Sequence, residues 1–451
     1  MKLAHKISGG LGAIALCAFL AMPAWAQDAA LQAPAAAAPT PSVDKGDTAW
    51  MMTSTILVLM MILPGLALFY GGLTRAKNML STMTQIGTAA AIAMVVWVMW
   101  GYTMAFGDGG NGFISGFGKL FLKGVTSAST AATFTDGVAI PEYVFVCFQM
   151  TFAAITVALV LGSVVERMKF AATVVFTLIW LTLVYFPIAH MVWAANGVFF
   201  AMGALDFAGG TVVHINAGVS ALVAALILGK RIGYPREPMA PHSMTLTFVG
   251  TGLLWVGWFG FNAGSALEAN GSAALAMINT FVATAAGALA WMAVERVAGH
   301  RPSALGFCSG VVAGLVAVTP AAGNSGPFGA IVLGAVASVV CYFAVAKLKP
   351  KLGYDDSLDA FGIHGIGGIV GALGTAIVYA PGLGGPGGAD YDMAKQMMTQ
   401  LLTVGTTILW AAFFTAIAIL IAKAVTGLRV SADCEREGLD LAEHGERAYN
   451  F

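Results

Sequence analysis

The sequence predicts an all-α polytopic membrane protein: eleven transmembrane helices, formed by two inverted five-helix units (5+5) and a final helix. Of its 451 residues, 58% are hydrophobic and only 10% are charged, which is too little charge to cover a soluble protein of this length. Basic and acidic residues balance at 22 each, and no basic cluster stands out, so nucleic acid is excluded as a main partner.

The first 49 residues are expected to precede the membrane domain. Residues 1–26 resemble a cleavable signal peptide, with Lys2 and Lys6, an apolar stretch, and the small-residue site Ala24-Trp25-Ala26. Residues 27–49, rich in Ala and Pro, predict a flexible exported N-terminus. A transmembrane domain at 50–427 and a cytoplasmic tail at 428–451 follow.

Eleven segments have the roughly 20 apolar residues that a helix needs to cross a bilayer. They run near 50–72, 84–106, 141–164, 171–193, 211–230, 243–262, 273–295, 304–320, 327–346, 360–380 and 399–423. With the N-terminus outside and the C-terminus inside, sixteen of the 22 basic residues are cytoplasmic and only Lys45, Lys119, Lys123 and Lys395 are exported outside the signal. An odd number of spans requires the same orientation.

Two histidines, His214 and His364, lie within apolar spans five and ten, which are equivalent positions in the two units. An ionisable group inside a bilayer indicates a functional site, and inverted units place such sites at their interface. One histidine alone could equally be structural, but the matched pair favours function. Adjacent imidazoles could share an N–H···N hydrogen bond, with their outer nitrogens facing a narrow path. That lining suits a small neutral molecule better than a hydrated metal ion. For His190, local hydrogen bonding is the favoured interpretation.

Aromatic residues gather near the outer ends of several spans: Phe148 and Phe152 in span three, Trp193 after span four, and Phe261 in span six. They are interpreted either as an interface belt with helix packing or as an aromatic cage for a small cation. Ser265 could add a hydroxyl acceptor to that cage.

Aspartates precede both histidines by eight residues: Asp206 before His214, and Asp356, with Asp359, before His364. We expect Asp206 mainly to cap the following helix, with an electrostatic attraction for cations as a side effect.

Four stretches together resemble the ammonium transporter family (Amt/Mep/Rh), in particular its bacterial Amt branch. They are Phe69-Tyr-Gly-Gly-Leu-Thr-Arg-Ala-Lys-Asn78, Asp206-Phe-Ala-Gly-Gly-Thr-Val-Val-His-Ile-Asn-Ala-Gly218, Trp258-Phe-Gly-Phe-Asn-Ala-Gly-Ser265 and Phe361-Gly-Ile-His-Gly-Ile-Gly-Gly368. The resemblance implies a homotrimer in the bacterial inner membrane that transports ammonium or methylammonium, is not an enzyme and has no cofactor.

The resemblance also implies roles for single residues. Phe152, Trp193 and Ser265 would recruit ammonium with support from Asp206, and Phe152 and Phe261 would form a phenylalanine gate. His214 and His364 would line the pore.

The C-terminal tail is similar to the bacterial family tail at Gly438-Leu439-Asp440 and His444-Gly445-Glu446. There the resemblance implies docking of a PII-type signalling protein, whereas the chemistry of the residues alone indicates a charged, solvated tail. Two other functions stay open: an ammonium sensor acting through PII-type partners, and a membrane haem or metal redox protein that uses the histidines as ligands. The five cysteines form no CxxC pair, so a cysteine-based metal site is not expected.

Overall fold

The computed structural model describes residues 42–450. Within that range, eleven helices are long and apolar enough to cross a membrane, the number expected from the sequence. The predicted signal peptide, residues 1–26, lies outside the described residues, as does most of the predicted exported N-terminus.

The first five spans are Lys45–Leu73, Ala76–Phe106, Glu142–Leu161, Phe170–Ala201 and Gly210–Leu228. Their α-helices are α2 (Lys45–Met60), α3 (Ala67–Leu73), α4 (Met79–Val96), α5 (Tyr102–Phe106), α6 (Glu142–Leu161), α7 (Phe170–Trp180), α8 (Phe186–Trp193), α9 (Val198–Ala201) and α10 (Asn216–Leu228). Wider π-type turns join some of them: η3 (Met61–Leu66), η5 (Trp97–Gly101), η7 (Leu181–Tyr185) and η8 (Gly210–Ile215).

The remaining spans are Met244–Gly264, Gly271–Val297, Ala304–Ala321, Pro327–Leu352, Phe361–Val378 and Met393–Thr426. They contain α11 (Met244–Gly264), α12 (Gly271–Val297), α13 (Ala304–Val318), α14 (Pro327–Phe343), α15 (Lys349–Leu352), α16 (Ile366–Val378) and α17 (Met393–Thr426), with π-type turns η10 (Ala344–Leu348) and η11 (Phe361–Gly365). Two short helices, α18 (Ala432–Glu437) and α19 (Leu439–His444), end the chain.

Short strands occur in the loops before α6. Strand β5 (Val138–Pro141) pairs with β1 (Ser42–Val43) and with β4 (Thr130–Ala132), and β2 (Gly110–Asn111) pairs with β3 (Ile114–Ser115).

Several helices extend beyond the predicted apolar segments because polar residues cap them. The Asp44 side chain accepts a hydrogen bond from the Asp47 amide at the start of α2, and Asp392 accepts from the Ala394 and Lys395 amides at the start of α17. Capped polar turns are helical without being apolar, so hydropathy misses them. Residues 42–49, predicted to be part of a flexible terminus, are thus a strand and the first turn of α2.

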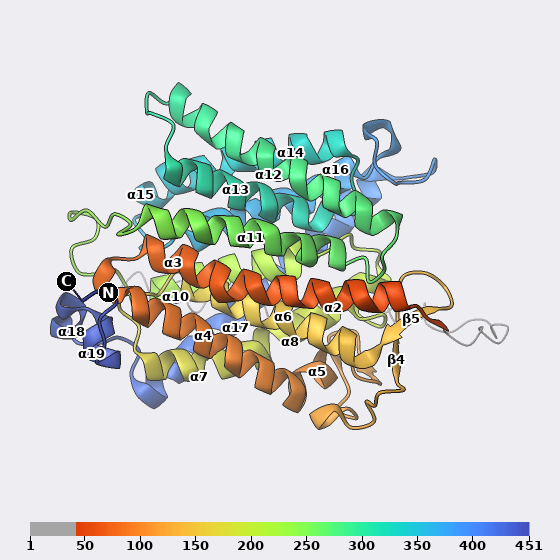
Figure 1. Ribbon diagram of the computed structural model, residues 1–451, viewed down its shortest axis with the longest axis horizontal. Coiled ribbons are helices and arrows are strands. Elements are labelled where there is room, and N and C mark those ends of the chain that lie inside the picture. The colour runs from red at the N-terminus through yellow and green to blue at the C-terminus, as the bar shows by residue number, and fades with distance from the viewer. Residues whose placement is uncertain (1–41, 451) are drawn as a thin grey trace.

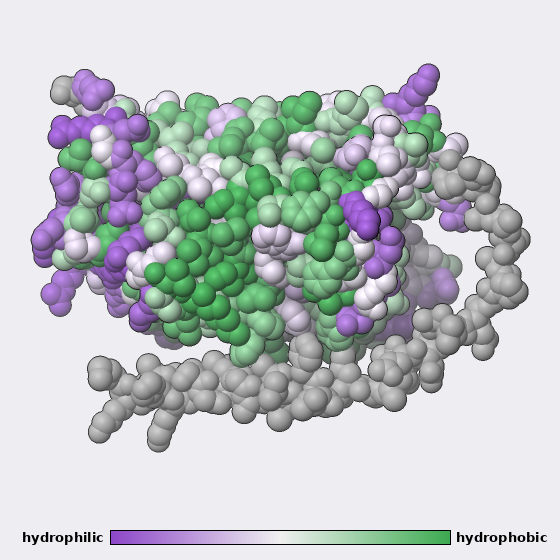
Figure 2. All heavy atoms as spheres, turned by 90° about the horizontal axis from the view of Figure 1, so that it is seen from below, coloured by the Kyte–Doolittle hydropathy of each residue, from purple (hydrophilic) through white to green (hydrophobic). Residues whose placement is uncertain are grey.

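The helices run along the long axis of the molecule, with α11 to α16 in the upper part of Figure 1 and α2 to α8 in the lower part. Figure 2 shows hydrophobic residues over the middle of the visible face and hydrophilic residues at its two ends, most densely at the end that carries the C-terminal helices. This distribution is that of a protein whose long axis crosses a bilayer.

The two histidine-bearing segments cross each other in a reciprocal way. The turn η8 packs against α16, and the turn η11 packs against α10. Glycines permit the crossing: a Cβ atom on Gly218 would lie 2.1 Å from the Gly365 nitrogen, and one on Gly368 would lie 3.0 Å from the Ile215 nitrogen. Backbones this close bring side chains of the two segments together.

Candidate functional site

A cavity of about 770 Å³ brings together four residues singled out from the sequence. We call it the outer cavity, and the one at the opposite end of the bundle the inner cavity, after the orientation predicted from the sequence. Phe152 comes from α6, Trp193 from the end of α8, Asp206 from the loop before η8, and Ser265 from the end of α11. The cavity thus joins three spans and a connecting loop that are far apart in the sequence.

Aromatic rings form the inner wall of this cavity. Phe152 meets Trp193 edge-on, with centroids 5.6 Å apart and planes at 83°, and Phe148 meets Phe152 at 4.9 Å. Phe261 stacks on Phe152 at 4.2 Å with an interplanar angle of 19°. A desolvated cation would meet ring faces at this wall, where cation–π attraction is strongest.

Ser265 presents an acceptor to the cavity. Its hydroxyl donates a 2.8 Å hydrogen bond to the carbonyl of Phe261. The hydroxyl proton is therefore occupied, and the oxygen lone pairs remain to accept from a ligand.

The Asp206 carboxylate is occupied by the protein itself. Its Oδ1 accepts from the Gly209 amide at 3.1 Å and from the Gly210 amide, and its Oδ2 accepts from the Thr211 amide at 3.0 Å, the Val212 amide at 3.2 Å and the Thr211 hydroxyl. Four of these five bonds satisfy the free amides at the start of η8. Asp206 also fixes Trp193, whose indole nitrogen donates to the Asp206 carbonyl at 2.9 Å. The capping interpretation agrees with this geometry.

Four rings lead from the outer cavity towards an inner one. Phe152 stacks on Phe261; Phe261 lies 6.0 Å from His214; and His214 lies 5.3 Å from His364, between ring centroids. Phe261 and His214 are fully buried. His364 borders an inner cavity of about 420 Å³. We call these four rings the ring column.

The structure brings the two histidines into direct contact, with their Nδ1 atoms 3.3 Å apart. The outer nitrogens differ, however. His364 borders the inner cavity, whereas the Nε2 of His214 lies 3.3 Å from the Thr319 hydroxyl. The Nε2 of His214 thus has the Thr319 hydroxyl as a neighbour, a contact that was not expected from the sequence.

The contacts of Thr319 determine which nitrogens of the neutral His214–His364 pair carry hydrogens. Its hydroxyl accepts from the Trp258 indole at 3.0 Å and donates to the Leu315 carbonyl at 2.8 Å, since an indole only donates and a carbonyl only accepts. The hydroxyl can then only accept from His214, so Nε2 of that ring carries the hydrogen. His214 Nδ1 accepts from His364 Nδ1, and His364 Nε2 is left as an acceptor.

Asp356 occupies the position before His364 that Asp206 occupies before His214, but its contacts are fewer. One oxygen accepts from the Phe361 amide at 2.7 Å, and the other is buried without a partner. Burial raises the pKa of Asp356, Lys349 opposes the shift and Asp359 adds to it, and together they bring the pKa to about 6. Lys349 pairs with Asp359 at 2.6 Å. Both histidines thus follow an aspartate into a π-type turn, but the charged groups around the two aspartates differ.

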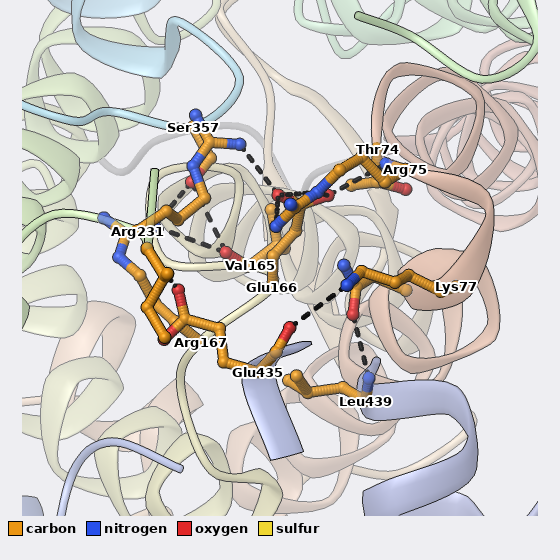
Figure 3. A network of polar contacts seen from close by, with 12 residues as sticks. Thr74, Arg75, Lys77, Val165, Glu166, Arg167, Arg231, Ser357, Glu435 and Leu439 are labelled. Atoms are coloured by element: carbon orange, nitrogen blue, oxygen red, sulfur yellow. Dashed lines mark hydrogen bonds and ion pairs between the residues drawn. The ribbon is translucent and has the colours of Figure 1, made fainter. Parts of the chain in front are cut away.

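A buried ion-pair network joins the loops beside the inner cavity (Figure 3). Glu166 lies 3.0 Å from Arg75 and 2.9 Å from Arg231, and Arg231 lies 2.8 Å from Asp355. Burial raises the pKa of Glu166, but Arg231 and Arg75 outweigh it and lower the pKa overall. Arg167 extends the network to the Asp355 carbonyl and the Ser357 hydroxyl.

The C-terminal tail is docked on these loops. Asp440 accepts from the Leu80 and Ser81 amides at 3.1 and 2.7 Å, and the Leu439 amide donates to Asn78 at 2.8 Å. Glu435 accepts from the Ile232 amide at 2.7 Å, next to Arg231 of the network. Figure 3 shows Glu435 and Leu439 reaching towards the span that contains Lys77. The interpretation of a solvated tail does not fit these contacts.

The other predicted tail residues lie beside the same face. His444 packs edge-on against Phe170 at 5.2 Å. Gly445 has a left-handed backbone, with φ of 69°, and ends α19. Gly438, with φ of 112°, sits against Lys77, whose Cβ would be 2.6 Å from any added Cβ. Glu446 is exposed.

His190 is fully buried outside both cavities. Its ring nitrogens lie 2.8 Å from the Ala105 carbonyl and 2.7 Å from the Asn111 carbonyl, in agreement with the local hydrogen-bonding interpretation. In the described part of the chain, residues 42–450, no three His, Cys, Asp or Glu side chains are grouped so as to hold a metal ion.

Sequence reasoning missed Thr319 and the ion-pair network. Thr319 is a single hydroxyl at the end of an apolar span and contacts His214 from 105 positions away. The arginines of the network, Arg75, Arg167 and Arg231, were considered only as positive charges that indicate the orientation of the loops. A single sequence carries no signal for either contact.

Comparisons with known proteins agree with this geometry. A model of the Ammonium Transporter Family matches residues 49–449. The chain is 50% identical to an ammonium transporter of Aquifex aeolicus, covering 91% of this chain and 94% of that protein, and 45% identical to one of Bacillus subtilis, covering 90% and 98%.

Solved structures agree as well. Mep2 of Saccharomyces cerevisiae is 35% identical with a TM-score of 0.77, covering 86% of this chain and 91% of that chain. A sensor Amt protein is 27% identical with a TM-score of 0.80, covering 88% and 98%. The chain, with its eleven spans, therefore belongs to the Ammonium Transporter Family, a family of membrane transporters and not of enzymes.

Proposed function

We propose that this protein takes up ammonium by binding NH4+ in the outer cavity and conducting NH3 along the ring column. The observation that carries the proposal is the column itself, which connects Phe152 in the outer cavity to His364 in the inner one. Phe152, Trp193 and Ser265 supply the recruiting site, and Phe152 with Phe261 forms the gate. Methylammonium, a slightly larger analogue, is the second expected cargo.

The physical chemistry of the column favours proton loss from the cargo. Moving NH4+ out of water into a fully buried apolar passage penalises its charge, so the neutral form gains an advantage. The released proton either returns to water in the outer cavity, which makes transport electroneutral, or crosses by a separate route, which produces a current. Within the pair His364 donates and His214 accepts, so His364 Nε2 offers its lone pair to an N–H of NH3. We infer that the pair guides a neutral cargo.

The test is ammonium-dependent current and flux in proteoliposomes, measured on solid-supported membranes. We expect His214→Ala and His364→Ala, singly and together, to reduce ammonium and methylammonium transport strongly. Size-exclusion profiles must match those of the unsubstituted protein, so that misfolding is not mistaken for loss of function. Full transport in a well-inserted double variant would refute the proposal. A transient current in the unsubstituted protein would indicate net charge transfer.

A sensing role is the second candidate, because one similar solved structure is described as a sensor Amt protein. A sensor would bind ammonium yet give no flux in liposomes. Equilibrium binding together with flux on the same preparation distinguishes the two. Haem or metal chemistry is tested by visible absorbance and metal analysis of the purified protein.

We further propose a homotrimer in the bacterial inner membrane, with the N-terminus outside, the C-terminus inside and the tail as a docking site for a PII-type protein. A regulatory role of the tail is supported because Glu435 contacts the loop that contains Arg231, and Arg231 lines the inner cavity. A native mass other than three times the mass of the mature protomer, from which the signal peptide has been cleaved, would refute the trimer. Loss of PII-type protein binding on deletion of residues 428–451 tests the docking site.

A further inference from the structure

A lysine side chain of the protein itself occupies a cation-binding position in the wall of the outer cavity. The Lys119 ammonium group lies 2.7 Å from Oε1 of Glu142 and 5.8 Å from the centroid of the Tyr102 ring. The Tyr102 hydroxyl donates to the same carboxylate oxygen at 2.8 Å. All three residues line the outer cavity. Because a carboxylate and a ring face both attract an ammonium group, we call Glu142 and Tyr102 together the lysine seat.

The lysine seat is part of the helical scaffold, whereas its occupant comes from a loop. Glu142 is the first residue of α6, where the helix dipole favours a negative charge, and its amide donates to the Ser129 carbonyl at 2.9 Å. Lys119 lies in the loop between α5 and α6 and carries its charge on a flexible four-carbon chain. The carboxylate therefore keeps its place on α6 whether or not the lysine reaches it.

The lysine seat is separate from the ring column. Glu142 and Phe152 are ten residues apart on α6, which corresponds to about 15 Å along the helix axis. Phe145 lies between them and also lines the cavity, with its ring 6.4 Å from that of Tyr102. A cation in the lysine seat would thus be too far from Phe152 to touch it.

Glu142 depends on a cation because it is almost completely buried. It is 5% exposed, and a buried carboxylate is unfavourable unless it is paired. Within residues 42–450, Lys119 forms the only ion pair of Glu142. Without that lysine, the carboxylate would border a cavity open to external cations and have no positive partner.

We propose that the lysine seat is a second binding site for primary ammonium ions, and that Lys119 fills it as a tethered ligand. The head group of lysine is a primary alkylammonium, the same chemical class as methylammonium. The proposal rests on the proposed function, because it concerns the cations that the outer cavity meets. With Lys119 in place, the cavity holds one external ion at the recruiting site, and none is trapped at Glu142.

Two simpler roles of the Lys119–Glu142 pair predict different results. A purely structural pair would only hold the loop to α6, so its loss would lower stability and no external amine would restore it. A general electrostatic role would change the affinity of the recruiting site without changing the number of ions bound. The number of bound ions therefore distinguishes the three possibilities.

The experiment measures binding of radiolabelled methylammonium to the detergent-solubilised full-length protein by equilibrium dialysis at low ionic strength. We expect the unsubstituted protein to bind one ion per protomer and Lys119→Met to bind two. Glu142→Gln in the Lys119→Met background should return the number to one. Lys119→Arg keeps a tethered cation and should stay at one. Lys123→Met, on an exposed lysine of the same loop that does not line the cavity, is the matched control and should also stay at one.

A melting curve gives an independent readout of the vacated seat. Methylammonium should raise the melting temperature of Lys119→Met more than that of the unsubstituted protein, because a ligand that binds only the folded state stabilises it. Tetramethylammonium has the same charge but no N–H group, so it should not replace the lysine. Lys119→Ala, studied in parallel, guards against a folding defect specific to the methionine.

Two outcomes overturn the inference: one ion per protomer in both Lys119→Met and Lys119→Ala, or a second ion that persists after Glu142→Gln. The proposed function fails separately. If the unsubstituted protein binds no methylammonium, the recruiting site is refuted, while a single Glu142-dependent ion in Lys119→Met would still support the lysine seat.

Discussion

Asp206→Asn tests whether the carboxylate before His214 is a helix cap or an attractor of cations. The substitution keeps the shape of the side chain but replaces one oxygen by an NH2 group. Each carboxylate oxygen accepts from two backbone amides, those of Gly209 and Gly210 or those of Thr211 and Val212. Whichever way the new amide turns, two backbone N–H groups lose their acceptor.

The magnitude follows from those two groups. A buried donor left unsatisfied costs about 1–3 kcal/mol, so we expect Asp206→Asn to lower the free energy of unfolding by about 2–6 kcal/mol. The Thr211 hydroxyl adds little, because it can rotate and accept from the new NH2. Transport should fall as well, since the cap positions η8, which carries His214.

The assay is reversible unfolding in mixed detergent and SDS micelles, with transport measured on the same preparations. Asp108→Asn is the matched control: its side chain is 86% exposed beside the outer cavity, and exposed substitutions usually change stability by less than about 0.5 kcal/mol. A cost below about 1 kcal/mol for Asp206→Asn, together with a raised half-saturating ammonium concentration, would refute the cap and favour attraction.

Three further predictions concern the column, the network and the tail. Thr319→Val leaves the indole and the imidazole that donate to its hydroxyl unpaired, so transport should fall. Thr375→Val, which loses only a bond to its own helix, should not change transport, and equal transport by the two variants would contradict a role for the Thr319 hydroxyl. Glu166→Gln breaks a buried pair and should cost about 3–5 kcal/mol. The pKa of Glu166 is lowered in the fold. Its contribution to the free energy of unfolding is therefore present above the unfolded pKa of about 4.3 and is lost as the pH falls through the folded pKa. A melting temperature that rises on acidification below pH 4 would refute this. Asp440→Ala removes the acceptor for two amides of α4, so it should lower the free energy of unfolding by about 0.5–2 kcal/mol and make the tail sensitive to protease. Glu437→Ala changes an exposed residue and should have neither effect. Equal cleavage of the two variants would contradict docking of the tail.

The ring column shows how far prediction from sequence extended. His214 and His364 were identified because ionisable groups in apolar spans are rare, whereas Phe152 and Phe261 received their roles from the resemblance to a family. Their order and the stacking of Phe152 on Phe261 were implied only by resemblance to a family. The contact of His214 with Thr319 had no sequence signal, because it depends on how span eight packs against span five.

The ends of the helices also separate what the sequence predicts from what only the structure shows. Hydropathy located the eleven spans, since each must bury about 20 apolar residues in the bilayer. It placed the starts of α2 and α17 too late, because their first turns are held by the caps Asp44 and Asp392 and not by burial of apolar surface.

The sequence by itself determined the number of spans, their expected orientation and the histidine pair, because transfer into a bilayer acts on each segment separately. Only the tertiary structure decided that the two histidines are in contact and which nitrogen of His214 carries the hydrogen. Those properties depend on hydrogen bonds, which require a partner within about 3 Å. The crossing of η8 with α16 and of η11 with α10 brings such partners together from positions more than 100 residues apart.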